Sequence, residues 1–149
     1  MGRLGAKLAV TVLAVLSLVM VTCGGGAPSR ALDNTAWTLG SIGGTAVTAS
    51  YAPTLQFAKG GAVRGVAACN SYFALAVIGE GTITFERLAL TAMACPDPAQ
   101  MELETAYVES LQATTNWSMD GDTLTLAGTT DLVFARSRPA ASPEPTTGS

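Results

Sequence analysis

Cysteine and carboxylate side chains are the main candidates for chemistry in this chain of 149 residues, because it contains no histidine. Without imidazole, Ser-His-Asp and Cys-His catalysis, histidine-ligated zinc and a switch near neutral pH are all excluded. Cys69 and Cys95 have no CxxC partner, and no histidine is present to activate either thiol. A structural disulfide between them is favoured over a reactive thiol, provided that the chain is exported.

The acidic residues offer two further kinds of site. Glu102, Glu104 and Glu109 could supply the carboxylates of a hydrolase, but a solvated helix face is the simpler interpretation of their spacing. The Asp-Gly-Asp sequence at 120–122 lacks the other ligands of a calcium loop and predicts a hairpin turn. We therefore expect no enzymatic activity, no catalytic residue, no metal site and no cofactor.

The first 30 residues predict export and membrane attachment. An apolar run at 8–21 follows two cations and would form about 21 Å of helix, shorter than the ~30 Å hydrocarbon core, as in a signal peptide. The sequence Met-Val-Thr-Cys at 20–23 resembles a bacterial lipobox, in which the cysteine carries diacylglycerol. We expect a lipoprotein-type signal peptide at 1–22, a lipid anchor on Cys23 and a flexible tether at 23–30.

This interpretation places the protein on the extracytoplasmic face of the cell membrane, and simple secretion after cleavage near Ala27 is the alternative. The chain after residue 22 holds six cations and eleven acids. Nucleic acid is a poor match for that charge, because its binders need a basic footprint. The expected partners are the membrane, through the anchor, and an unidentified envelope protein or cell-wall component.

Alternating apolar and polar residues predict an antiparallel sheet for most of the remaining chain. The pattern is clearest at 37–39, 55–57, 83–85 and 124–126. Two stretches, 72–78 and 132–135, are more uniformly apolar, and we expect them to be covered on both faces or close to it. Paired or isolated glycines at 60–61, 79–81 and 121 predict the connecting turns.

One helix interrupts the pattern. Asp97 is a good N-cap, Pro98 suits the first turn, and no glycine or proline follows as far as Ala113. Its apolar stripe consists of Ala99, Leu103, Ala106, Tyr107 and Leu111. Because a helix cannot bury such a stripe alone, we expect an α+β, mostly β domain at 31–138: a strongly curved antiparallel sheet or open β-barrel with one α-helix packed on it. A disordered tail would follow at 139–149.

Four segments of this domain form a recognisable series. The first two are the opening Leu-Asp-Asn-Thr-Ala-Trp-Thr-Leu at 32–39 and Gly-Val-Ala-Ala-Cys-Asn-Ser-Tyr-Phe at 65–73. The others are Leu-Thr-Ala-Met-Ala-Cys-Pro at 90–96, followed by the helix with Glu104, Tyr107 and Leu111, and Gly-Asp-Thr-Leu-Thr-Leu at 121–126, followed by Leu-Val-Phe-Ala-Arg at 132–136. Together they resemble the META (HslJ-like) family. The resemblance implies a small envelope or secreted domain without established enzymatic activity. Its relatives are associated with stress tolerance and secretion, and its cysteines coincide with Cys69 and Cys95.

Function is accordingly expected to be that of a noncatalytic interaction or stress-tolerance scaffold. The alternative is a lipid or small-molecule carrier, which requires an apolar void near Leu103, Tyr107 and Leu111. Asn70 is a candidate structural or binding residue, since its side chain can bond backbone groups. Tyr72 and Tyr107 are further candidates, either as core packing or as the lining of such a void.

Overall fold

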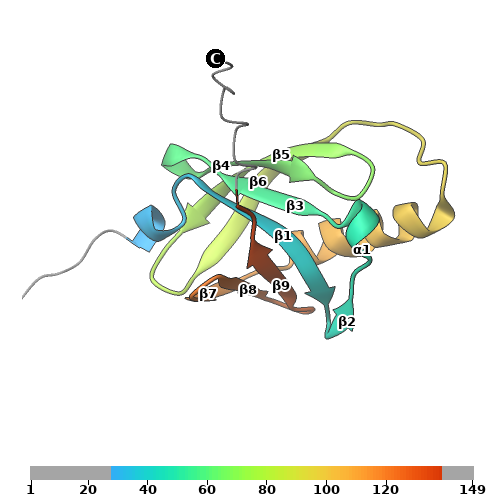
Figure 1. Cartoon of the computed structure of the whole chain (residues 1–149). Coiled ribbons are helices and arrows are strands. Elements are labelled where there is room, and N and C mark those ends of the chain that lie inside the picture. The colour runs from blue at the N-terminus through green and yellow to red at the C-terminus, as the bar shows by residue number, and fades with distance from the viewer. Residues whose placement is uncertain (1–27, 139–149) are drawn as a thin grey trace, which may run out of the picture.

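The computed structural model describes residues 28–138, which form one curled sheet with a single α-helix (Figure 1). The predicted signal peptide, Cys23 and the C-terminal tail lie outside the described residues. Within them, no helix has the length and apolar character to span a bilayer. The elements are η1 (Pro28–Ala31), β1 (Thr35–Ile42), β2 (Thr45–Ala46), η2 (Ala49–Tyr51), β3 (Thr54–Phe57), η3 (Lys59–Gly61), β4 (Ala62–Val66), β5 (Ser71–Ile78), β6 (Ile83–Leu90), α1 (Pro98–Gln112), β7 (Asn116–Asp120), β8 (Thr123–Ala127) and β9 (Leu132–Arg136).

The sheet is antiparallel and curls into a half-barrel, which confirms the predicted fold class. Its strand order is β6-β5-β4-β3-β1-β9-β8-β7, and β2 pairs with the end of β1. Where the two edge strands approach, Ile83 N donates to Thr115 O at 3.0 Å and Trp117 N donates to Gly81 O at 3.0 Å. These two bonds join the edges at one point, so the curl is nearly closed there.

Helix α1 covers the open side of the half-barrel, packing against β6 and β9 (Figure 1). Asp97 caps it as predicted, with its side chain accepting from Ala99 N at 2.9 Å. Tyr107 and Leu111 are fully buried, whereas Ala99 and Ala106 are exposed. The predicted stripe was therefore too wide, because only the edge of it that holds Tyr107 and Leu111 faces the core.

The core fills the concave side of the sheet and contains Trp37, Leu55, Ile83, Leu124 and Phe134 among its fully or almost fully buried side chains. The expectation that 72–78 is covered on both faces is wrong. Phe73 is 49% exposed and Val77 is 56% exposed, on the convex face of β5. Strand β9 likewise exposes Ala135. A single helix covers only the concave side, so nothing within 28–138 is layered over these convex positions.

The turns follow the predicted glycines. Gly60 and Gly61 adopt φ values of 77° and 80° between β3 and β4, and Gly121 adopts 55° between β7 and β8. Such values are unfavourable for residues with a Cβ. At the start of the described residues, Pro28–Ala31 forms a 3₁₀ turn that leads into β1.

Candidate functional site

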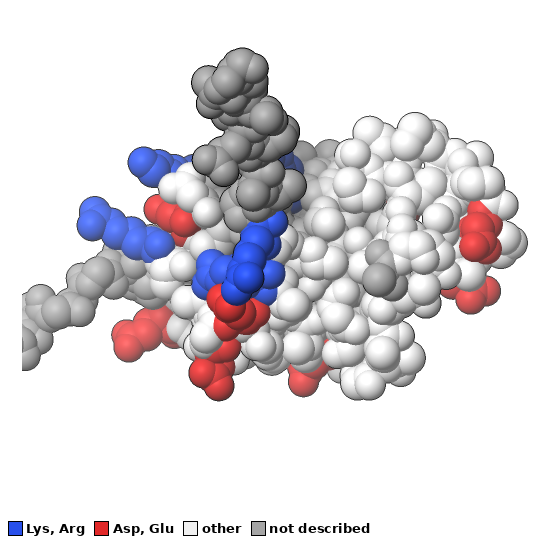
Figure 2. All heavy atoms as spheres, in the orientation of Figure 1, with Lys and Arg blue, Asp and Glu red and all other residues white. Residues whose placement is uncertain are grey.

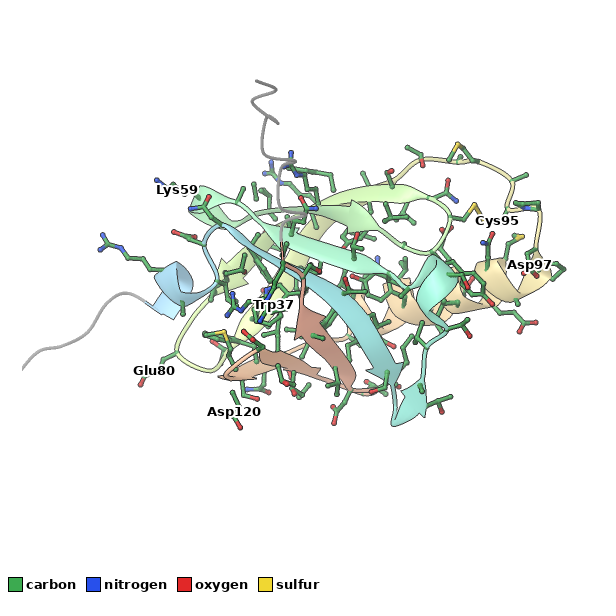
Figure 3. The ribbon with its side chains drawn as sticks, viewed as in Figure 1. Trp37, Lys59, Glu80, Cys95, Asp97 and Asp120 are labelled. Carbon is green, nitrogen blue, oxygen red and sulfur yellow. A yellow bond between two sulfur atoms is a disulfide. The ribbon has the colours of Figure 1, made fainter. Side chains whose placement is uncertain are left out.

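A disulfide joins Cys69 to Cys95, with 5.9 Å between their Cα atoms and a sequence separation of 26. Cys69 lies in the β4–β5 connection, and Cys95 lies in the loop that leads into α1. Figure 3 shows Cys95 and Asp97 at the helical end of the domain. The bond therefore ties the 91–97 loop to the start of β5.

Glu104 reinforces the same junction from α1. Its Oε2 accepts from Asn70 N at 2.6 Å and from Cys69 N at 3.3 Å, while its Oε1 accepts from Asn70 Nδ2 at 2.7 Å. The expectation that all three helix glutamates lie on a solvated face is thus wrong for Glu104. A signal was present in the sequence, because Glu104 precedes Tyr107 by three residues and so shares its side of the helix.

Asn70 connects the loop to this junction. Its side chain is almost completely buried, and Oδ1 accepts from Met93 N at 2.8 Å and from Thr91 Oγ1 at 2.9 Å. Its Nδ2 also donates to Met93 O at 3.2 Å. Because an amide nitrogen only donates and a carbonyl only accepts, these partners fix the orientation of the side-chain amide. The anticipated side-chain-to-backbone bonding is therefore present, but to a loop 23 residues away.

We call Cys69, Asn70, Met93, Cys95 and Glu104 the Asn70 cluster. The two sulfurs and a Glu104 oxygen lie within 4.8 Å of one another, a spacing that would suit metal ligands. In the disulfide, however, neither sulfur is a thiolate, and thiolate is the form that binds metal. The carboxylate already accepts three hydrogen bonds. The cluster as it stands is suited to holding the loop in place.

The side chains of Tyr72 and Tyr107 contact each other in the core. Their hydroxyl oxygens are 2.7 Å apart, and Tyr72 donates to Thr54 O at 2.8 Å. The carbonyl takes the Tyr72 proton, so Tyr107 must donate to Tyr72. Burial raises the pKa of both phenols well above the usual value. Both therefore stay protonated and neutral near pH 7, which fits a structural role in the core.

Gly65 makes this arrangement possible. It lies opposite Tyr72 in the β4–β5 register. A Cβ at Gly65 would overlap the Thr54 carbonyl oxygen and would come within 2.8 Å of Tyr72 Cε1. The glycine of the 65–73 motif is therefore required by the close approach of the tyrosine ring and the neighbouring strand.

The remaining acidic candidates lie elsewhere. Glu102 and Glu109 are exposed on α1, and Asp122 pairs with Arg136 at 3.0 Å. The Arg136 guanidinium lies 4.4 Å from the centre of the Trp37 ring. The 120–122 sequence thus forms the predicted hairpin, and one of its carboxylates fixes an arginine over the core tryptophan.

Of the three residues near which a carrier would need an apolar void, only Leu103 borders an open space in the structure. An open groove of about 380 Å³ lies between α1 and the β1–η2 segment, lined by Ile42, Val47, Tyr51 and Leu103, among others. Tyr107 and Leu111 do not line it, because both are packed in the core. The groove is therefore a surface feature on one flank of the helix.

The META domain family matches residues 30–140 of the chain. The chain belongs to the META domain family. The match extends over the whole half-barrel, including the Asn70 cluster, the paired tyrosines and α1. No curated protein matches the chain.

Three solved structures share the fold of this META domain. The NMR structure of a protein from Burkholderia xenovorans is 27% identical and covers 74% of this chain and 87% of its own, with a TM-score of 0.62. A second NMR structure is 26% identical, with a coverage of 72% and 92% and a TM-score of 0.62. A crystal structure of a DUF4847 family protein from Bacteroides vulgatus, at 11% identity and a TM-score of 0.53, is similar in fold alone.

Proposed function

We propose that this META domain protein is a noncatalytic scaffold of the bacterial cell envelope, exported and held on the extracytoplasmic face by a lipid on Cys23. The lipobox-like sequence at 20–23 supports the anchor, and the apolar run at 8–21 supports export. A disulfide between Cys69 and Cys95 suits a compartment in which such bonds persist. In this proposal the protein has the stress-tolerance or assembly role that the HslJ-like resemblance implies.

The observation that carries the scaffold proposal is the fixed 91–97 loop. The disulfide holds it at Cys95, and Asn70 bonds both backbone groups of Met93. The Met93 side chain nevertheless remains 60% exposed. Because the backbone of this loop is already fixed, binding through Met93 costs little further backbone entropy, so the loop is well suited to contact an envelope protein.

Cross-linking in intact cells tests this role. A photoreactive residue placed at Ala92 should cross-link to a defined envelope protein, and the same reporter at Thr105, on the exposed side of α1, should not. Met93→Ser should weaken the cross-link without lowering the melting temperature, since its side chain is mostly exposed. Equal labelling from both positions, or an unaffected cross-link in Met93→Ser, would contradict a partner-binding loop.

The groove beside Leu103 supports a second candidate function, the binding of a lipid or small apolar ligand. The groove has a mainly apolar lining. Its volume of about 380 Å³ is at the lower end of the range of known ligand pockets. A Leu103→Asp substitution should abolish binding of such a ligand. If Leu103→Asp leaves a co-purifying ligand in place, the groove is not its site.

A further inference from the structure

The convex face of β4, β5 and β6 is an uncovered apolar surface. Val66, Phe73 and Val77 are 40%, 49% and 56% exposed, respectively. The three lie on one face of the sheet: Val66 is opposite Ser71, two residues before Phe73 on β5, and Val77 follows Phe73 by four residues on the same face. Exposed apolar side chains that are grouped in this way mark contact surfaces more often than scattered ones do. We call this surface the convex patch.

Both signs of charge border the convex patch, since the exposed Glu86 of β6 lies opposite Leu75, between Phe73 and Val77. Residues 30–96 hold four cations and three acids, whereas 97–138 hold two cations and seven acids. Arg64 lies directly opposite Phe73 in the β4–β5 register and is exposed. On the face shown in Figure 2, the basic side chains lie over the left half together with acidic ones, while the right half shows only acidic charges. Residues 30–96 therefore carry the more positive part of the domain, and Arg64 brings one of its cations to the patch.

The chain that precedes the domain enters near one end of the patch. The η1 turn lies beside η3, which connects β3 to β4. Asp33, Gly61 and Ile78 line one shallow hollow there, so the link from η1 into β1 runs next to the end of β5. Five residue steps separate Cys23 from Pro28 and can span at most about 18 Å. A lipid on Cys23 would hold this end of β5 close to the bilayer.

We propose that the convex patch lies against an anionic phospholipid bilayer, with Phe73 and Val77 in the headgroup region and Arg64 beside lipid phosphates. The inference rests on the proposed Cys23 anchor and adds an orientation to it. A patch of this kind supplies the second, weaker contact that many lipidated proteins use. Each cation near an anionic surface adds to the attraction. The 91–97 loop, at the opposite end of β5 from η1, stays available for a partner.

The test uses full-length protein extracted with its lipid and returned to phosphatidylglycerol vesicles with brominated acyl chains, which quench nearby tryptophan. Phe73→Trp places a reporter in the patch. Met101→Trp is the matched control, because Met101 is 53% exposed on α1. The wild-type protein supplies the background from Trp37 and Trp117. The Phe73→Trp reporter should lose most of its added emission, and the Met101→Trp reporter should retain it. Replacing Arg64 with serine in the Phe73→Trp protein should shift the equilibrium between docked and undocked domain about fivefold toward the undocked form. The quenching should fall accordingly.

Vesicle flotation, measured on the same samples, separates the two proposals. Protein that floats while Phe73→Trp remains unquenched by lipid and open to aqueous iodide overturns the docking and leaves the anchor. A Phe73→Trp reporter shielded from both quenchers means that a protein or second copy covers the patch, which also overturns lipid docking. Protein that does not float at all contradicts the anchor and the docking together.

Discussion

Removing the Asn70 side chain should destabilise the domain strongly, because this side chain makes more hydrogen bonds than any other in the Asn70 cluster. Asn70→Ala deletes four side-chain hydrogen bonds, to Met93 N, Met93 O, Thr91 Oγ1 and Glu104 Oε1. Each is worth about 0.5–1.5 kcal/mol net. Thr91 and Met93 are exposed, so water replaces part of what they lose. A value of about 0.75 kcal/mol per bond gives about 3 kcal/mol for the four.

Urea denaturation at pH 7, monitored by tryptophan fluorescence, measures this loss. In thermal unfolding, at roughly 4 °C per kcal/mol for a domain of this size, the melting temperature should fall by about 12 °C. Asn70→Asp is the matched control: it keeps the shape and the acceptor but loses the donor and places a second carboxylate beside Glu104. It should be at least as destabilising as Asn70→Ala. Glu104→Gln keeps one acceptor and should cost less.

A loss below about 1 kcal/mol for Asn70→Ala, with an unchanged dependence on urea, would refute the structural role assigned to this residue. If the cross-link from the 91–97 loop were lost at the same time, Asn70 would have to contact the partner directly. Retained stability and a retained cross-link would mean that the disulfide alone positions the loop.

Three further changes test other parts of the domain. Because burial raises the folded pKa of Tyr72 and Tyr107 while the unfolded value is about 10, their contribution is complete below pH 10 and is lost above it. Above pH 10, the unfolding free energy should fall by about 1.4 kcal/mol per pH unit for each of the two tyrosines. In a pH series of urea titrations, Tyr107→Phe should halve that slope. An unchanged slope would contradict the burial of the pair. Replacing both Cys69 and Cys95 with serine should cost about 3 kcal/mol in thermal or urea unfolding, because the bond closes a loop of 26 residues; a cost near zero would mean that the bond does not form. Gly65→Ala should cost more than 2 kcal/mol and shift the Tyr72 ring resonances. Gly40→Ala is the control for a strand glycine outside this contact, because its Cβ would come no closer than 3.5 Å to Val133 O.

Local patterns were sufficient to predict the elements of this fold. Alternation marked the strands, glycines marked the turns, and Asp97-Pro98 marked the helix start. Curvature was also predictable, since one helix must cover an otherwise open sheet. Which strands form the edges was not predictable, because pairing such as Ile83 with Thr115 depends on contacts between residues far apart in sequence.

The candidate site was predicted less completely. The cysteine pair and Asn70 were identified from residue type and spacing. Glu104 was predicted to face solvent because it is charged, although its position on the helix places it on the same side as Tyr107. The convex exposure of Phe73 was missed for the opposite reason, since a uniformly apolar strand predicts cover on both faces. In both cases the decisive fact is the neighbour in space, which a single sequence does not contain.

The most direct test of the proposed function is mass spectrometry of the full-length protein gently extracted from its own envelope, with native and denatured spectra compared. A denatured mass of residues 23–149 plus a covalent lipid, absent after Cys23→Ser, is the predicted result. A further mass retained only in the native spectrum would identify the class of partner or ligand. An unlipidated protein, whether uncut or cleaved at another residue, would contradict the anchored scaffold.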